Sequence, residues 1–252
     1  MTENQRIALW KAEEEAAHIH GWDFSHIDGK YTEENDLPWD YRTRILDHLT
    51  SEMRILDIDT GGGEFLLSLG HPHKNTAATE AYPPNVELCK KILLPLQVDF
   101  RPGEAASLPF EDEAFHMVIN RHGDFCPPEI ARVLKKGGLF ITQQVGAEND
   151  RELVELLMGK WENPFPGQYL KDAENRLRNA GLDIIEGQEC FNPIRFFDVG
   201  ALVWFARIIQ WEFPGFSVEG NLDRLWQAQR LLEEKGCIEG RIHRFFLTAQ
   251  KG

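Results

Sequence analysis

The sequence predicts an α/β fold built on a parallel sheet that helices cover on both faces. Three observations support this prediction: five short apolar runs recur between residues 53 and 145, amphipathic stretches separate them, and a glycine-rich turn follows the first run. Apolar runs that alternate with helical patterns are typical of strand–helix units in a parallel sheet. Because the chain has 252 residues, we expect one structural domain with a sizeable core.

The five apolar runs predict five strands in chain order. They cover residues 53–58, 76–80, 95–100, 115–120 and 139–145. Two of the connecting stretches, 83–94 and 127–138, open on a pair of prolines, which favours the start of a helix. The second stretch closes on two glycines, which commonly follow the end of a helix. We therefore expect a helix in each connection.

The two ends of the chain are expected to add to this core. Residues 1–50 contain Trp10, Trp22 and Trp39 and predict an aromatic-rich N-terminal helical cap. Residues 51–147 form the expected ligand-binding core. Residues 148–252 supply the remainder of the sheet, with a helical lid inserted at about 192–238. Within this last part the pattern predicts helices over 167–181, 199–211 and 221–236, a strand after Gly181 and a final strand over 241–250.

Composition limits the partners. The chain carries 41 acidic against 27 basic residues, a formal charge of −14, and has no run of basic residues that would neutralise a phosphate backbone. Nucleic acid is therefore not an expected partner. The most apolar window, 199–206, is followed by Arg207 and is far shorter than the roughly 20 residues of a membrane span. The N-terminus lacks the pattern of a signal peptide, so we expect a cytoplasmic protein without a membrane partner.

Cysteine and histidine give no sign of a disulfide framework or a metal site. The four cysteines are scattered without a C-x-x-C pair, which suits reduced thiols. Alternate histidines on a helix do not face one another, and no carboxylate or cysteine stands at ligand spacing from them. We expect no metal. The histidine pairs considered are His18 with His20 and His71 with His73.

The glycine-rich turn lies in the stretch "RILDIDTGGGEFLLSLG", residues 54–70. A dinucleotide fingerprint starting at Gly61 and Gly63 needs a third small residue at position 66, where the chain has Leu66. Asp57, Asp59 and Glu64 would also repel a pyrophosphate by about 1 to 4 kcal/mol for each pair of charges. The turn therefore favours a cationic ligand over a nicotinamide dinucleotide.

A second carboxylate follows the next strand along the chain. Glu80 ends the run 76–80, a position from which a carboxylate accepts hydrogen bonds from a ribose diol in doubly wound nucleoside sites. Ribose together with a cation, and without phosphate, describes S-adenosylmethionine. The residues thus predict S-adenosyl-L-methionine as the cofactor.

Four segments together carry a resemblance to a known family. They are "ILDIDTGGGEFL", "TEAYPPNVELCKKI", "GEAASLPFEDEAFHMVINRHGDF" and "EIARVLKKGGLFITQQV". In this order they resemble the class I S-adenosylmethionine-dependent methyltransferases, in the small-molecule and ubiquinone-biosynthesis-like branch, over roughly residues 40–147. The resemblance implies a Rossmann-like, doubly wound, seven-stranded and mostly parallel sheet with the last strand antiparallel. It also implies in-line transfer of a methyl group to an O, N or C atom of a small acceptor.

The resemblance implies roles for single residues. Asp57, Gly61 and Gly63 match the motif around the methionine moiety, and Glu80 matches the ribose-binding acid. Glu104 and Ala105 match the pair that contacts adenine, and Asn120 to His122 lie where the fourth strand meets cofactor and acceptor. The full expected cofactor set is Asp57, Asp59, Thr60, Gly61, Gly63, Glu80, Ala81, Glu104, Ala105, Asn120 and Arg121.

The chain departs from the family pattern at three of these positions. Asp59 replaces the first glycine of the turn, and aspartate is one of the few residues that tolerate a left-handed backbone. His116 replaces the aspartate that commonly opens the fourth strand, and Glu104 replaces the commoner aspartate. These departures keep open a protein that binds the cofactor without catalysis. An RNA methyltransferase and a nicotinamide-dependent oxidoreductase are the less favoured alternatives.

Candidate residues for the chemistry each have a plainer interpretation. His122 is the candidate general base, or it only packs beside the cofactor. Arg121 clamps an acidic acceptor or pairs with a neighbouring carboxylate. Trp204, Trp211 and Phe213 line an apolar acceptor pocket or form the core of the lid. The acceptor is expected to be a small molecule, and the protein a monomer or homodimer.

Overall fold

The computed structural model describes residues 1–18, 23–33 and 36–252, which divide into two compact units. The first unit comprises Met1–Leu37, Ala147–Pro166 and Phe191–His243, and the second comprises Pro38–Gly146, Gly167–Cys190 and Arg244–Gly252. Each unit gathers segments that are far apart in the sequence, whereas the ranges expected from the sequence are contiguous. The second unit contains the expected cofactor residues, and the first contains the whole of the expected lid, residues 192–238.

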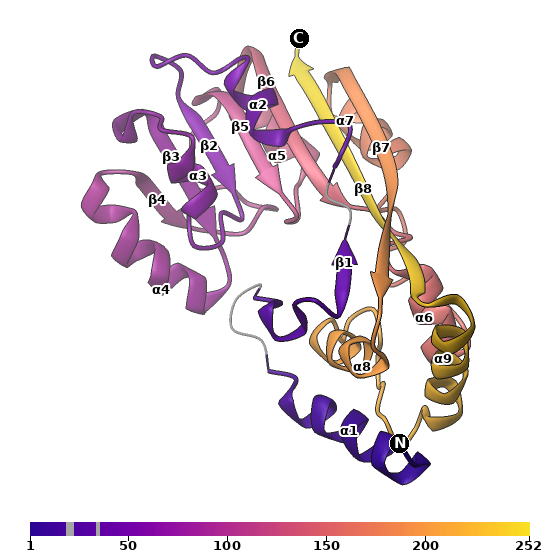
Figure 1. Ribbon diagram of the computed structural model, residues 1–252. Coiled ribbons are helices and arrows are strands. Elements are labelled where there is room, and N and C mark those ends of the chain that lie inside the picture. Colours follow the sequence, from indigo (N-terminus) through magenta and orange to yellow (C-terminus); the bar gives the residue numbers. More distant parts are fainter. Residues whose placement is uncertain (19–22, 34–35) are drawn as a thin grey trace. The chain divides into compact units, whose positions relative to one another are not determined.

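The strands form one sheet in the order β1-β7-β8-β6-β5-β2-β3-β4 (Figure 1). The five strands predicted first pair in parallel along this order, and β8 runs antiparallel to β6. The predicted mostly parallel sheet with an antiparallel last strand is thus confirmed. The strands are β2 (Ile55–Ile58), β3 (Thr76–Glu80), β4 (Asp99–Pro102), β5 (Phe115–Arg121), β6 (Leu134–Val145), β7 (Leu182–Phe196), β8 (Ile238–Lys251) and β1 (Tyr31–Glu33).

Three strand predictions need correction. The strand expected over 139–145 begins earlier, because α5 (Pro127–Val133) ends before the two glycines and β6 runs through them from Leu134. Residues 1–50 are not purely helical, because β1 pairs antiparallel with the end of β7 and gives the described sheet an eighth strand. The strand expected over 95–100 begins four residues later than predicted. Leu94–Leu96 form a short 3-10 helix, Gln97 has a left-handed backbone with φ 65°, and β4 begins only at Asp99. Pro95 has no N–H to donate to a strand ladder, which explains why the run starts as a turn.

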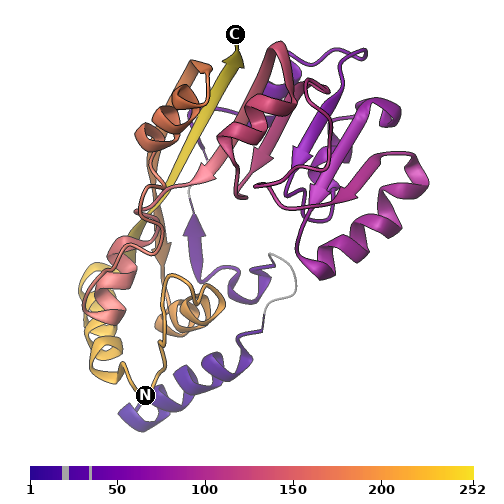
Figure 2. The ribbon, with the colours of Figure 1, turned by 180° about the vertical axis from the view of Figure 1, so that it is seen from behind.

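Helices cover both faces of the sheet in the second unit. In Figure 1, α2 (Tyr41–Leu46) and α3 (Glu64–Ser68) lie in front of the sheet, and in Figure 2, α5 (Pro127–Val133) and α7 (Leu170–Asn179) lie in front of it. The predicted helix over 83–94 is α4 (Pro83–Ile92), with prolines in its first turn. Buried Phe115, Val118 and Phe140 of the sheet pack with residues of α5 and α7 to form the core of this unit.

The first unit is mainly helical. Its helices are α1 (Glu3–Ala16), α6 (Arg151–Met158), α8 (Val199–Ile208) and α9 (Leu222–Lys235), with a 3-10 turn at Ser25–Ile27. The helix α8 is apolar and buried at every position except Arg207, so it lies inside the core, as expected for a helix without a continuous polar face. The helix α9 ends at Gly236, whose φ of 80° confirms the predicted glycine stop. Across the described parts of the chain, no helix has the length and apolarity to traverse a bilayer.

Candidate functional site

The glycine-rich turn connects β2 to α3 at the carboxyl end of the parallel strands. Asp59, Gly61 and Gly63 all have left-handed backbones, with φ of 54°, 64° and 85°. The expectation that Asp59 tolerates this conformation is confirmed. The Thr60 N–H donates to the Thr79 carbonyl at 3.0 Å, which ties the turn to the end of β3. The chain therefore presents a tight loop where ligands of doubly wound sheets bind.

Asp57 is the buried acid at the end of β2. Its Oδ2 accepts a hydrogen bond from the Thr60 hydroxyl at 2.6 Å. Burial raises the pKa of Asp57 to about 7, and the nearby carboxylates of Asp59 and Glu80 add to this rise. The Thr60 hydrogen bond and the positive charge of Arg121 lower the pKa but do not cancel the effect of burial.

The pKa of Asp59 is raised for the same reasons as that of Asp57. Partial burial raises its pKa to about 6, with further contributions from the charges of Glu80 and Asp124. Two neighbouring carboxyl groups with raised pKa values mean that negative charge at this turn is poorly compensated by the protein itself. A bound cation would favour their ionised forms and would therefore be stabilised in this position.

Glu80 is held by the protein on both of its carboxylate oxygens. Its Oε2 accepts from the Gly61 N–H at 2.9 Å and from the Asn85 side-chain amide at 3.2 Å. Its Oε1 accepts from the Ala81 and Tyr82 N–H groups, both at 2.9 Å. A carboxylate has about four lone-pair sites, so ribose hydroxyls would share or replace these donors. In this structure Glu80 connects the glycine turn to the start of α4.

The end of β5 brings three further predicted residues to the same edge. Asn120 is fully buried, and its side-chain amide donates to the Ile58 carbonyl at 2.9 Å, which locks β5 to the end of β2. Arg121 places its guanidinium 4.5 Å from the centre of the Phe65 ring. His122 has a left-handed backbone with φ 61°, and its N–H donates to the Gln143 carbonyl at 2.9 Å.

The His122 ring has an unusual environment for a general base. Its Nε2 lies 3.1 Å from the side-chain nitrogen of Gln143. Surrounding protein atoms, followed by the positive charges of Arg244 and Arg121, lower the pKa of His122 to about 3. His122 nevertheless keeps exposed surface. A neutral imidazole whose Nε2 accepts a hydrogen bond has its proton on Nδ1.

The expected adenine-contacting pair lies beyond β4. The Gly103 N–H donates to the Glu80 carbonyl at 3.1 Å, which brings this loop to the end of β3. Glu104 is exposed, while Ala105 packs into the core of the second unit. Their contact with a cofactor stays a prediction.

Four residues of this edge were not assigned a role from the sequence: Trp39, Tyr41, Phe65 and Gln143. Tyr41 is buried and its hydroxyl lies 3.0 Å from the Asn120 carbonyl and 3.2 Å from the Ile141 carbonyl. Its ring stacks on Phe65 with centroids 5.3 Å apart. Trp39 is buried and its indole N–H donates to Gln143. The aromatic stretch "LPWDY" before β2 was the available signal, but its partners lie too far along the chain to be read from spacing.

The expected acceptor-pocket residues belong to the first unit. Trp204 and Phe213 are buried in its hydrophobic core, and Trp211 is 45% exposed. The indole nitrogen of Trp204 is buried and has no hydrogen-bond partner among the described residues. Of the histidines considered for metal, His20 lies outside the described residues, as does Trp22 of the expected cap. Within the described ranges, no group of three or more His, Cys, Asp or Glu side chains is placed to hold a metal ion.

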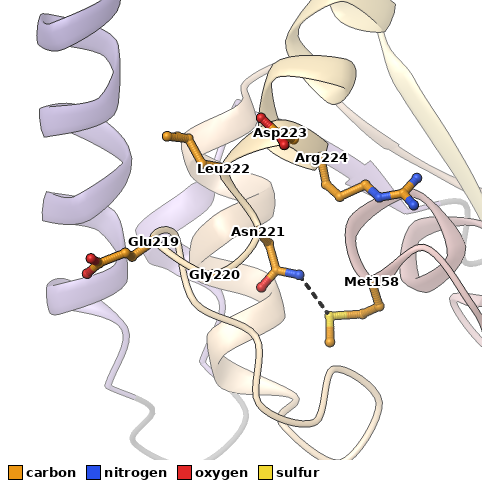
Figure 3. Close-up of a pocket in the computed structure, with 7 residues that line it drawn as sticks. All are labelled: Met158, Glu219, Gly220, Asn221, Leu222, Asp223 and Arg224. Atoms are coloured by element: carbon orange, nitrogen blue, oxygen red, sulfur yellow. Dashed lines mark hydrogen bonds between the residues drawn. The ribbon is translucent and has the colours of Figure 1, made fainter.

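Two cavities lie away from the glycine turn. In the first unit, a cavity of about 340 Å³ is bordered by Met158 and by residues 219–224 at the start of α9 (Figure 3). There the Asn221 amide is directed toward the Met158 sulfur and also donates to the Leu157 carbonyl at 3.1 Å. In the second unit, a cavity of about 140 Å³ is bordered by His116, Lys135 and Gly138, among others. Neither cavity is lined by a residue of the expected cofactor set.

Comparison with known proteins gives a consistent result for the second unit. Residues 56–142 match the family model described as a methyltransferase domain. Over 140 residues the chain is 30% identical to the phthiotriol/phenolphthiotriol dimycocerosates methyltransferase of Mycobacterium leprae, and the match covers 52% of this chain and 49% of that protein. The corresponding Mycobacterium ulcerans protein 1 is 28% identical over 149 residues, covering 55% and 51%. The matched region thus spans about half the length of these curated relatives.

Solved structures show the same fold at low sequence identity. A candidate methyltransferase from Bacillus halodurans has a TM-score of 0.58 and 20% identity, covering 83% of this chain and 98% of that one. A functionally unknown protein from Deinococcus radiodurans has a TM-score of 0.59 and 15% identity, covering 88% and 91%. At these identities the likeness concerns the fold alone.

Proposed function

We propose that this protein transfers a methyl group from S-adenosylmethionine to a small acceptor, because residues 56–142 match the family model of a methyltransferase domain and the chain shares the fold of a candidate methyltransferase of known structure. The observation that carries the proposal is the coincidence of this match with the acidic glycine turn. The turn and the three parallel strand ends β2, β3 and β5 all lie inside the matched range.

The charge of the turn supports this cofactor over other nucleotides. Asp57 and Asp59 have raised pKa values and would be ionised more readily beside a positive ligand. The sulfonium and ammonium groups of S-adenosylmethionine are positive, and its adenosine carries no phosphate. A dinucleotide would place further negative charge against these carboxyls at an electrostatic cost. We propose the cofactor set that the resemblance implies: the turn for the methionine moiety, Glu80 for ribose, and Glu104 with Ala105 for adenine.

Methyl transfer mainly requires that the protein align the acceptor with the cofactor. The sulfonium methyl is already electrophilic, so the main task of the residues around it is to hold an acceptor lone pair in line with it. Arg121, fixed over the Phe65 ring, contributes positive charge at the end of β5. The low pKa of His122 argues against a role as general base, because a group with this pKa takes up a proton only in acid.

For the acceptor we propose a small and partly apolar molecule. The mycobacterial relatives are named for phthiotriol and phenolphthiotriol dimycocerosates, which supports a lipid-like acceptor class without naming the substrate of this chain. In the first unit, Trp211 remains the proposed apolar residue for acceptor choice, whereas Trp204 and Phe213 lie in the hydrophobic core of that unit, as their alternative interpretation expects. A cytoplasmic monomer or homodimer that binds no nucleic acid completes the proposal.

A second candidate is a protein that binds the cofactor or its demethylated product without turnover. Two observations favour keeping it: Asp59 replaces a glycine of the turn, and the carboxylate of Glu80 already accepts four hydrogen bonds from the protein. Methyl transfer from labelled S-adenosylmethionine to any acceptor in a screen of apolar hydroxyl and amine compounds would eliminate this candidate.

Isothermal titration of the purified protein with S-adenosylmethionine, S-adenosylhomocysteine and NAD tests the proposal. We expect micromolar binding of the first two ligands and none of NAD. Tight binding of NAD alone would replace the proposal with an oxidoreductase. Binding of none of the three would show that the turn has lost its ligand and would overturn both candidates.

A further inference from the structure

Three residues of the second unit form a chain of hydrogen bonds that ends on His122. The indole N–H of buried Trp39 donates to Oε1 of Gln143 at 2.8 Å. The side-chain nitrogen of Gln143 then lies 3.1 Å from Nε2 of His122. Gln143 is itself 8% exposed, so both of its polar ends are used within the protein.

The direction of every hydrogen bond in this chain follows from its first member. An indole N–H is a donor only, so the group of Gln143 that faces Trp39 must be its oxygen. The other end of the amide is then an NH₂ group, which is also a donor only. The His122 Nε2 that faces this NH₂ group must therefore be an unprotonated acceptor. Trp39 thus sets the orientation of an amide that could otherwise be placed in either of two ways.

The same geometry disfavours protonation of His122. An imidazolium carries protons on both nitrogens, so it would set an N–H of the ring against an N–H of Gln143. The charged groups that face the ring act in the same direction, since both are positive: Arg121 precedes His122 in β5, and Arg244 lies on β8, which pairs with β6. The backbone adds a restraint, because His122 has φ 61° and its N–H is bonded to the Gln143 carbonyl.

We propose that Trp39 and Gln143 are positioning residues that hold His122 as a neutral imidazole with its proton on Nδ1, so that it offers a hydrogen-bond donor, and not a base, to the acceptor molecule. His122 is an exposed residue, and its Nδ1 forms no hydrogen bond with the described residues. Such a donor favours acceptors that present an oxygen or nitrogen lone pair beside the reacting atom. The contact between the Nδ1–H group and an acceptor molecule rests on the proposed function, whereas the tautomer of His122 does not.

The tautomer is measured directly by long-range ¹H–¹⁵N correlation spectra of the ligand-free protein between pH 5 and 8. The variant His122→Asn identifies the signal, and asparagine suits the left-handed backbone of this position. In the wild type we expect the pattern of a neutral ring protonated on Nδ1 across the whole range. A ring protonated on Nε2, or one that titrates near 6.5, the ordinary pKa of histidine, would overturn the proposal.

Two variants test the chain of hydrogen bonds. In Trp39→Phe the indole donor is lost while an aromatic ring remains, so the Gln143 amide is free to turn and the signal of the Nδ1–H form is partly lost. In Gln143→Glu a carboxylate accepts from both neighbours, so the proton moves to Nε2 and the pKa of His122 rises by roughly 1 to 3 units. If Gln143→Glu leaves both the tautomer and the titration unchanged, the proposed chain does not control His122.

A matched control separates this effect from general disturbance. Tyr41→Phe removes a buried hydroxyl group from the same N-terminal segment. This hydroxyl contacts the Asn120 and Ile141 carbonyls and not Gln143. We expect the His122 spectrum of this variant to match that of the wild type. Because all spectra are recorded without cofactor, a failure of the tautomer prediction and a failure to bind S-adenosylmethionine are separate outcomes.

Discussion

At the scale of single residues, Glu80 shows how a predicted ligand contact also has a structural role. The sequence predicts Glu80 as the ribose-binding acid, and the structure adds that it accepts from three backbone N–H groups and from Asn85. Three of these four donors are main-chain N–H groups, those of Gly61, Ala81 and Tyr82. Glu80 is therefore expected to order the glycine turn as well as any bound ribose.

Replacement of Glu80 by glutamine tests this double role. The variant keeps the size of the side chain but sets an NH₂ group against donors, so we expect the free energy of unfolding to fall by about 1 to 3 kcal/mol. Asn85→Ala is the control, since it removes one side-chain donor and leaves the carboxylate and the main chain intact, with an expected loss of about 1 kcal/mol. Denaturant unfolding of the three proteins gives these values. Equal stability of Glu80→Gln and wild type would contradict the structural role.

At the scale of elements, the β2–α3 turn depends on two glycines for different reasons. Gly61 has φ 64° and open space where a Cβ would lie. Gly63 has φ 85°, and a Cβ there would come within 2.8 Å of the Leu93 side chain at the end of α4. Both positions thus carry the cost of a left-handed backbone, while only Gly63 also controls how closely α3 approaches its neighbour.

Alanine at each position separates these two costs. Gly61→Ala is expected to lower the free energy of unfolding by about 1 to 2 kcal/mol, the penalty of a left-handed backbone for a residue with a Cβ. Gly63→Ala is expected to lose more than this, because Leu93 must also shift in a packed core. Thermal unfolding of both variants measures the difference. A smaller loss for Gly63→Ala than for Gly61→Ala would mean that Leu93 does not limit the turn.

The elements also show which parts of the fold the sequence could reveal. The strand β3 and the end of α9 at Gly236 were predicted at the observed positions, because apolar runs and helix-end glycines act locally. The strand β1 was missed because it is three residues long and exists only through its pairing with β7. The contact of Trp39 with Gln143 was missed for the same reason, since 104 positions separate them and no spacing rule connects them.

At the scale of the whole molecule, the excess of negative charge makes the site sensitive to pH. The chain has a formal charge of −14, and its turn contains Asp57 with a pKa raised to about 7 and Asp59 with a pKa raised to about 6. Both folded values lie above the ordinary 3.8, so between about pH 4 and 7 the folded state binds more protons than the unfolded state. The contribution of these two groups to stability is therefore full below pH 4 and is lost as pH rises through 7.

A positively charged ligand should bind more tightly as these two carboxyl groups lose their protons. S-adenosylmethionine favours the ionised carboxyls, so its affinity is expected to rise by about tenfold between pH 5 and 8, which corresponds to a change of one pKa unit on binding. S-adenosylhomocysteine lacks the sulfonium charge and should show a shallower rise, and Asp57→Asn should flatten both curves. Titration calorimetry at several pH values measures the slopes. Parallel curves for the two ligands would show that the carboxyls do not sense the sulfonium, because the two ligands differ only in the transferable methyl group and the positive charge that it confers.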